Sequence, residues 1–530
     1  MEEFDYIIVG SGSSGSVITN RLSEINDIKI CVLEAGGTNQ HPYIKMPAGF
    51  IKTINDKRFN WCFKTEANEN VNNREILFPR GKGLGGSSSI NGHLYVRGQP
   101  EDYNQWAQLG NTGWAYDDIL PYFKKSEFKE NGDEKFRGKN GPLFVSDIVE
   151  KHPLCEEFIE SSKEIGVSIQ EDYNAGNQEG IFYYQRTIKN GTRFSAYDAF
   201  LKPAIKRKNV KVDTNTIVLK IIFKEKKAIG LLCEKNKKQF KIFANKEIIL
   251  CGGAIGTPHL LQVSGVGNSN YLKNIGIPII HESTNVGAGL QDHYAVRVSN
   301  SIKLPITLNE KARGYKLFLE IMKWFVLKKG LISFSPAHVG AFLKSSPEID
   351  LPDLQFVFTP ASYTEGMIGK LQNIPGITCG VWQSRPQSRG YVRALSSCIK
   401  DAPLIQPNYL KETIDQDVLI QGVKICRDLL KTSNMKKISI KETLPGKNIK
   451  TDSEILNFIK NNGATVYHAI GSCRMGIDKG AVVDANLKLN GVENLRVADA
   501  SIMPTMPSGN TNAATLMIAE KASDLIKKDM

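Results

Sequence analysis

The chain has 530 residues, of which 41% are hydrophobic and 8% aromatic, as in a globular protein of more than one domain. Its formal net charge of +13 comes from lysines spread along the whole chain without an aromatic and basic module, which excludes nucleic acid as the expected partner. Nine scattered cysteines without a C-x-x-C pair argue against a disulfide framework or a metal site and favour a reducing compartment.

The first stretch, residues 4–34, predicts a βαβ unit that binds a dinucleotide. Apolar residues 6–9 are typical of a buried parallel strand, and a G-x-G-x-x-G spacing follows at the turn into a helix. A second strand over 29–33 ends in Glu34, at about the spacing of an acid that binds ribose hydroxyls. The turn and helix N-terminus would hold the phosphates, and a glycine-rich turn without a ligand is the alternative. The turn residues are Gly10, Gly12, Ser13 and Gly15.

A second glycine-rich segment follows a long, loop-rich connection over 36–78, which we interpret as functional or as a covering lid. Between residues 81 and 92 the chain has five glycines and three serines, too flexible a composition for the interior of a helix or strand. The backbone N–H groups of such a loop can closely wrap a flat or anionic ligand. We therefore predict a second cofactor-binding loop, with a plain surface loop as the alternative.

A third glycine-rich turn lies in the middle of the chain. Residues 247–250 predict a buried strand, and glycines at 252, 253 and 256 lead from it into a helix. We interpret this turn as another backbone approach to the same cofactor. The alternative is a purely structural turn.

Residues from about 300 to 460 have no dinucleotide signals and are the candidate substrate side. Within them, residues 315–329 predict the most apolar helix of the chain, although its lysines do not fall on one clean face. We interpret it as a packed cap helix. The alternative is a helix that contacts a membrane surface or gives access to a quinone.

The C-terminal stretch predicts a return to the nucleotide-binding domain. His468 lies in a short apolar segment flanked by glycine, and a strand over 495–498 ends in Asp499. A proline-punctuated loop then leads to a helix that begins near Asn510 or Thr511. The N-terminus of that helix would face an anionic or electron-rich group.

With these stretches in view, the chain resembles the glucose–methanol–choline (GMC) family of flavoprotein oxidoreductases nearly from end to end. GKGLGGSSSIN over 81–91 and GAIGTPHLLQVSGVG over 253–267 match the two family signatures. YVRGQPEDYNQW, GLQDH and GNTNAATLMIAEKASD are typical of the branch with bacterial choline and alcohol dehydrogenases. The resemblance implies an α/β fold in which a Rossmann-like FAD-binding domain is interleaved with an α+β substrate-binding domain.

The resemblance also implies domain limits and a cofactor. We expect an N-terminal FAD-binding region with lid insertions over 1–297, a substrate-side segment over 298–384, and a C-terminal region over 385–522 that carries the catalytic residues. Ile90 stands where some family members have a histidine joined covalently to the flavin, so we expect non-covalent FAD. The implied cofactor-binding residues are Gly10, Gly12, Ser13, Gly15, Glu34, Gly85, Gly86, Ser87, Asn91, Asp499, Asn510 and Thr511.

The implied reaction is oxidation of a primary alcohol to the aldehyde by hydride transfer to flavin N5, with the electrons passed to a quinone or another non-oxygen acceptor. By its motif, His468 is the expected base and Asn510 the second catalytic polar residue. His93 and His293 are interpreted as structural, with a place lining the cofactor as the alternative. Ala469 stands where relatives often have proline, which affects the expected loop geometry rather than the chemistry.

Three other functions remain open at this level. Choline dehydrogenase is the main alternative, and it would need a carboxylate and an aromatic surface for the trimethylammonium group. A lyase of the hydroxynitrile type, which keeps FAD structurally, is less favoured. A flavin-holding protein without catalysis is disfavoured because both His468 and Asn510 are present.

The expected location is cytoplasmic. The N-terminus begins with acidic residues and enters a strand at once, and no apolar run reaches the roughly 18 residues that span a bilayer. Most lysines are interpreted as solvated. A weak attraction to anionic lipid, and so a peripheral position on the inner membrane, is the alternative.

Overall fold

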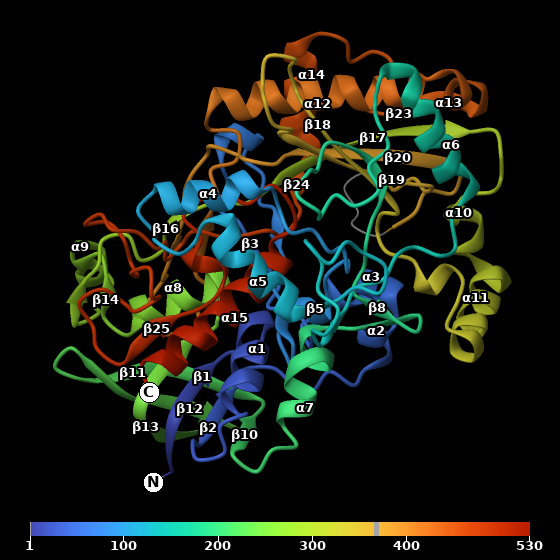
Figure 1. The fold of residues 1–530 in the computed structure, drawn as a ribbon. Helices are drawn as coiled ribbons and strands as arrows, with labels where there is room; N and C mark the ends of the chain where they lie inside the picture. Colours follow the sequence, from blue (N-terminus) through green and yellow to red (C-terminus); the bar gives the residue numbers. More distant parts are fainter. Residues whose placement is uncertain (1, 365–369) are drawn as a thin grey trace.

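The computed structural model describes residues 2–364 and 370–530. Within these residues two seven-stranded sheets lie in different halves of the molecule, and both chain termini lie near the first sheet (Figure 1). The first sheet has the order β10-β2-β1-β13-β12-β11, and β25 pairs with β13. Its strands are β1 (Glu3–Val9), β2 (Ile30–Leu33), β10 (Val210–Asp213), β11 (Thr216–Lys224), β12 (Lys227–Lys235), β13 (Lys238–Leu250) and β25 (Leu495–Val497).

The parallel part of this sheet brings distant segments to one edge. Val9 pairs in register with Leu33 and Leu250, and Leu250 pairs with Val497. The glycine turn, the acid after β2, the turn after β13 and the acid after β25 therefore all begin at the same level. Ligands of open parallel sheets bind at this carboxyl edge.

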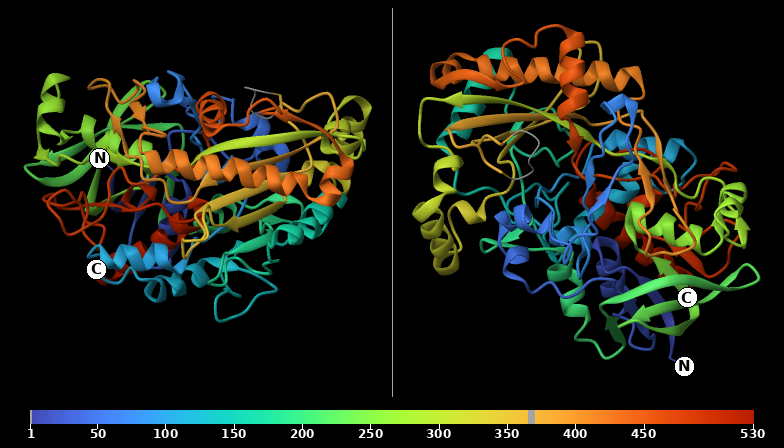
Figure 2. Two further views of the ribbon diagram at one scale, coloured as in Figure 1. Left: turned by 90° about the horizontal axis from the view of Figure 1, so that it is seen from above. Right: turned by 180° about the vertical axis from the view of Figure 1, so that it is seen from behind.

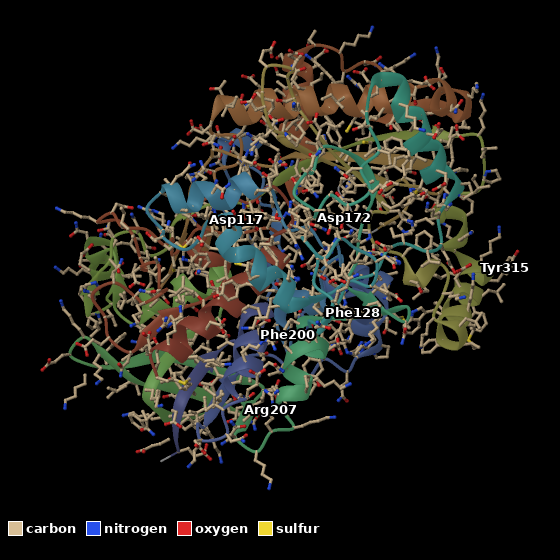
Figure 3. The ribbon with its side chains drawn as sticks, in the orientation of Figure 1. Asp117, Phe128, Asp172, Phe200, Arg207 and Tyr315 are labelled. Carbon is tan, nitrogen blue, oxygen red and sulfur yellow. The ribbon has the colours of Figure 1, made fainter. Side chains whose placement is uncertain are left out.

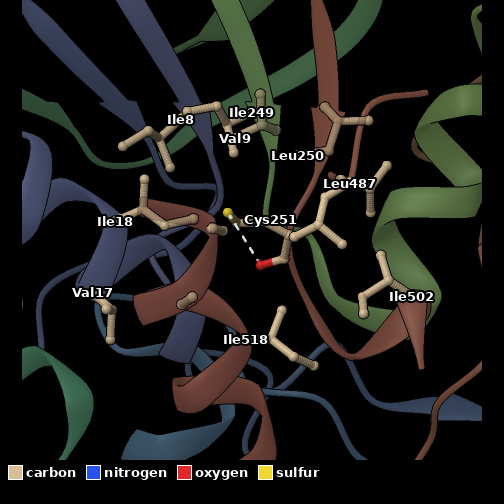
Figure 4. Packing of buried hydrophobic residues seen from close by; sticks show 14 of the residues in the cluster. Ile8, Val9, Val17, Ile18, Ile249, Leu250, Cys251, Leu487, Ile502 and Ile518 are labelled. Atoms are coloured by element: carbon tan, nitrogen blue, oxygen red, sulfur yellow. Dashed lines mark hydrogen bonds between the residues drawn. The ribbon is translucent and has the colours of Figure 1, made fainter. Parts of the chain in front are cut away.

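Helices α1 (Ser13–Leu22) and α15 (Thr511–Lys528) pack together beside these strands. Figure 4 shows the apolar contact: Ile8 and Leu250 from the strands meet Ile18 of α1 and Ile518 of α15, and all four side chains are buried. Cys251, the residue after β13, points its thiol toward the carbonyl oxygen of Ala498 at 3.9 Å. This core joins the first and last helices of the chain.

The second sheet is antiparallel and has the order β23-β17-β20-β19-β18-β7, with β24 paired to β17. The long helix α12 (Thr413–Lys431) packs against β20 and covers one face, as both views in Figure 2 show. The strands are β7 (Gly180–Tyr183), β17 (Tyr294–Ile302), β18 (Val339–Leu343), β19 (Leu354–Thr359), β20 (Gly376–Gln383), β23 (Ser439–Leu444) and β24 (Ala464–Thr465).

The chain thus crosses between the two sheets several times, because β7 precedes β10–β13 in sequence and β24 precedes β25. An α/β fold with interleaved parts, as predicted, is present. The division at residues 297 and 384 stays a prediction.

Candidate active site

The turn after β1 needs glycine at two positions. Gly10 has a φ of +96°, and a Cβ there would lie 2.6 Å from the carbonyl oxygen of Cys251. A Cβ on Gly15 would lie 1.9 Å from the carbonyl oxygen of Gly10. Because no side chain fits, α1 starts close against the strand, and its N-terminus opens at the carboxyl edge of the sheet.

The predicted second loop lies directly against this turn. Gly86 opens a short 3₁₀ turn, η3 (Gly86–Ser89), with a φ of +51°, and a Cβ on it would lie 2.8 Å from Cα of Gly12. Gly85 donates its N–H to the carbonyl oxygen of Ser11 at 2.9 Å. Two backbone segments without side chains therefore face each other, which is the kind of cradle that a pyrophosphate needs.

Glu34 ties these segments together. Its Oε2 accepts hydrogen bonds from the backbone N–H and hydroxyl of Ser11 at 3.0 and 2.7 Å. Its Oε1 accepts the backbone N–H groups of Gly36 and Gly83 at 2.8 and 2.9 Å. The buried carboxylate thus has four donors from the chain itself. Its predicted contact with a ribose stays a prediction.

The third and last segments meet through Asp499. Its Oδ2 accepts the N–H of Gly253 at 2.8 Å and the hydroxyl of Thr257 at 2.6 Å, both at the start of α8 (Gly253–Val263). Ser13 of α1 donates its hydroxyl to Oδ1 of Asn512 in α15 at 2.6 Å. Asp499 thus ties the segment after β25 to the N-terminus of α8, and Ser13 ties the N-terminus of α1 to that of α15.

The remaining predicted cofactor residues belong to the second glycine-rich loop, as Ser87 and Asn91 do, or to the start of α15, as Thr511 does. Ser87 Oγ accepts the N–H of Gly81 at 3.0 Å, which closes the loop on itself. Asn91 Oδ1 accepts from Nη1 of Arg193 at 2.8 Å. Thr511 is the buried first residue of α15, and its carbonyl oxygen accepts the hydroxyl of Thr515 at 2.8 Å.

His468 is held by its backbone. Tyr467, just before it, has a φ of +73°, a conformation that a residue with a Cβ seldom adopts. The flanking groups are fixed: Arg80 donates to the carbonyl oxygen of Tyr467 at 2.8 Å, and the N–H of His468 donates to Oδ1 of Asp292 at 2.6 Å. Oδ2 of Asp292 accepts the hydroxyls of Tyr409 and Thr465.

The imidazole of His468 has a polar partner on each nitrogen. Nε2 lies 2.9 Å from Nδ2 of Asn510, the N-cap of α15, and Nδ1 lies 2.9 Å from Nδ1 of His293. Because an amide nitrogen donates and does not accept, Nε2 of His468 is the acceptor and carries no proton. The structure thus brings together the two residues predicted to be catalytic.

Burial keeps the ring neutral. His468 is 8% exposed, and desolvation, with smaller effects of His293 and the Arg80 cation, holds its pKa well below the ordinary value of 6.5. The pKa of His293 is lowered by burial to about 4. A neutral imidazole with a bare nitrogen can accept a proton at neutral pH.

Comparison with known proteins shows the family of the chain. The N-terminal and C-terminal profiles of the GMC oxidoreductases match residues 4–295 and 386–519. The chain belongs to the GMC oxidoreductase family. It is 39% identical to the Pseudomonas putida alcohol dehydrogenase (acceptor), covering 99% of this chain and 96% of that protein. It is 38% identical to human mitochondrial choline dehydrogenase, with coverage of 99% and 90%.

Solved structures of GMC enzymes have the same fold. Pyridoxine 4-oxidase from Mesorbium loti superposes with a TM-score of 0.89 at 29% identity, and the match covers 99% of each chain. An Aspergillus oryzae formate oxidase variant, described by the modification of its FAD, superposes with a TM-score of 0.93 at 25% identity over 100% and 98% of the chains. The predicted family, the fold class, FAD as cofactor and alcohol oxidation as the class of reaction are confirmed.

The residues present fit FAD. The Gly12–Gly86 approach leaves a backbone cradle without side chains, and a buried donor nearby, Nη2 of Arg193, lacks a protein partner within the described residues. Unpaired buried donors are costly unless a ligand satisfies them. Arg193, Asp292 and Gln355 were not predicted from the sequence, although Asp292 and His293 belong to the GLQDH motif.

Proposed function

We propose that this enzyme oxidises a primary alcohol to the aldehyde and passes the electrons to a quinone or another non-oxygen acceptor. The observation that carries the proposal is the bare Nε2 of neutral, buried His468 next to the amide of Asn510. The Pseudomonas relative is named an alcohol dehydrogenase (acceptor), which supports the class of reaction.

His468 takes the alcohol proton in this proposal, and Asn510 stabilises the oxygen. The alcohol hydroxyl would donate to Nε2 of His468, in the place where the amide of Asn510 donates now. The displaced amide can then donate to the alcohol oxygen as negative charge develops on it. Bound FAD supplies the hydride acceptor, and Ile90 offers no side-chain nitrogen for a covalent link, so we propose non-covalent attachment. The residues proposed to hold FAD are Gly10, Gly12, Ser13, Gly15, Glu34, Gly85, Gly86, Ser87, Asn91, Asp499, Asn510 and Thr511.

Choline is the second candidate substrate, since a relative is a choline dehydrogenase. The ring of Trp382 lies 6.3 Å from that of His468 and could contact a trimethylammonium group. The nearby carboxylate of Asp292 is already occupied by three donors, and buried Arg80 adds positive charge that disfavours a cationic substrate. We therefore place uncharged alcohols first.

Anaerobic titration of the purified holoenzyme separates these substrates. Loss of the visible flavin band with uncharged primary alcohols, and not with choline, is the expected result. Bleaching by choline alone would favour the second candidate. An unchanged flavin spectrum with every alcohol, in protein loaded with FAD, would contradict the proposal.

We also propose that the enzyme is cytoplasmic and contacts the inner membrane through α11 (Gly314–Leu327). One face of α11 packs against the protein, as expected for a cap helix. Trp324 on this face is buried against Met46 and Ile332 and donates to the carbonyl oxygen of Gly191 at 2.8 Å. The helix lies at the edge of the molecule (Figure 1), and Tyr315 points away from its body (Figure 3).

The outward face of α11 is apolar. Phe318 is 62% exposed and Val326 is 74% exposed. The other exposed apolar side chains of the helix are Tyr315, Leu319, Met322, Phe325 and Leu327. Residues 311–329 contain six lysines or arginines against one glutamate, so an anionic bilayer fits this surface better than a second copy of the same basic helix.

Within the described residues, no helix is long and apolar enough to pass through a bilayer, so the proposal concerns its surface only. A quinone dissolved in that bilayer would be within reach of the enzyme. The nine free thiols fit the reducing cytoplasm.

Vesicle flotation tests this contact. The holoenzyme should float with phosphatidylglycerol vesicles and less with phosphatidylcholine vesicles, and Phe318→Glu with Val326→Glu should abolish flotation. The matched control is Val149→Glu with Ile477→Glu, which changes two residues that are 88% and 77% exposed elsewhere. Equal flotation of both double variants would contradict the role of α11.

A further inference from the structure

The hydrogen bonds around His468 form one continuous network, and in each bond the donor and the acceptor are fixed. At one end, Nε2 of His293 lies 2.8 Å from the carbonyl oxygen of Ser384, which follows β20. A carbonyl only accepts, so His293 carries its proton on Nε2, and its Nδ1 is bare. The Nδ1 of His468, 2.9 Å away, must then carry the proton between the two rings, and Nε2 of His468 is left bare.

The hydrogen bonds on the Asn510 side of His468 also leave Nε2 of His468 without a proton. The hydroxyl of Tyr184 donates to the carbonyl oxygen of Phe356 at 2.9 Å, so it must accept from Nε2 of Gln355 at 2.9 Å. The second N–H of Gln355 points to Oδ1 of Asn510 at 3.2 Å. Asn510 therefore turns its NH₂ group toward His468.

We propose that His293 and Gln355 are positioning residues that select the reactive tautomer of His468 and the orientation of Asn510. The inference rests on the proposed role of His468 as the base. The two ends of this hydrogen-bond network are backbone carbonyls, that of Ser384 after β20 and that of Phe356 in β19. Because a carbonyl can only accept, the fold itself determines which group donates in every hydrogen bond between them.

His293 positions the base and does not carry the proton away. Its ring is 0% exposed, and its second nitrogen ends on a carbonyl oxygen that cannot pass a proton onward. When His468 becomes positively charged, its Nδ1–H keeps the same acceptor, so the bond strengthens without rearrangement. The bare Nε2 and the stabilised cation thus depend on one nitrogen, Nδ1 of His293.

Two conservative variants separate the two bonds of His293. An asparagine amide oxygen can take the place of Nδ1 and accept from His468, whereas a glutamine amide nitrogen takes the place of Nε2 and donates to Ser384. His293→Asn should therefore reduce flavin at a rate close to that of the wild type. His293→Gln and His293→Phe should be slower by about tenfold or more at saturating alcohol, with FAD content unchanged.

Histidine ¹⁵N NMR of the holoenzyme gives a readout that a merely structural role would not move. His468 should show a bare Nε2 in the wild type and in His293→Asn, and a mixture of tautomers in His293→Phe. His259→Gln, which removes another buried histidine, is the control and should leave both the tautomer and the rate unchanged. From the other end, Gln355→Glu should slow flavin reduction because a carboxylate faces Oδ1 of Asn510.

The outcomes distinguish the inference from the proposed function. If His468→Ala reduces flavin as fast as the wild type, the proposed base is wrong. If His468→Ala is inactive while His293→Phe keeps both the bare Nε2 and the wild-type rate, the base is right and the positioning role is refuted.

Discussion

Replacing Asp292 with alanine tests how the fold holds His468 in place. The carboxylate accepts the backbone N–H of His468 and two hydroxyls, all buried, and faces the Arg80 cation. Removing it leaves these donors unpaired and the buried cation without a counter-charge, which costs about 3–5 kcal/mol. Asp292→Asn keeps one oxygen acceptor for His468 but also removes the counter-charge of Arg80, so it should cost about 2–3 kcal/mol, less than alanine.

The melting temperature of the holoenzyme measures this difference. At about 2.1 cal/mol/K per residue, unfolding 530 residues has an entropy of about 1.1 kcal/mol/K, so Asp292→Ala should lower Tm by about 3–5 °C. The alanine variant should also lose kcat/KM, because His468 is no longer fixed. A Tm within about 1 °C of wild type, together with unchanged kcat/KM, would refute the reasoning.

Three further predictions concern the cofactor cradle and the buried histidines. Gly86→Ala should reduce the FAD content of purified protein because its Cβ would lie 2.8 Å from Gly12 Cα, whereas Gly166→Ala, also at positive φ but with nothing within 4 Å, should keep its FAD. Glu34→Gln should destabilise the holoenzyme by about 3 kcal/mol in chemical denaturation, because the new NH₂ group then faces two of the four groups that donate to Glu34. A free energy of unfolding equal to that of the wild type would contradict these contacts. Burial lowers the pKa of His259 to about 4. Between pH 6.5 and 4 this histidine is therefore protonated in the unfolded chain and neutral in the folded protein, and the free energy of unfolding falls by about 1.4 kcal/mol per pH unit as the pH is lowered. His259→Gln should remove this contribution, so parallel pH–stability curves for the variant and the wild type would disprove it.

The sequence predicted the cofactor edge because local rules determine it. Strand, glycine spacing and helix follow one another within residues 4–34, and the structure adds only the close approaches that make Gly10 and Gly15 obligatory. The position of Asp499 after a strand and that of Asn510 before a helix were predicted in the same way. Their specific roles toward FAD and substrate stay proposals.

The contacts between distant segments could not be read from the sequence. His293 was interpreted as structural, and its bond to His468 depends on the pairing of β17 with β20 and β24, which no local pattern reveals. Gln355 has no motif of its own, and its place follows from the register of β19. The apolar pattern of α11 predicted a helix, but which apolar residues face outward depends on packing against Met46 and Ile332.

Rapid anaerobic mixing with a primary alcohol tests the central claim most directly, because it isolates flavin reduction in wild type and in His468→Ala. We expect the wild type to bleach quickly at neutral pH and the variant, with equal FAD content, to be slower by about 10²-fold or more. Equal rates in the two proteins would show that His468 is not the base.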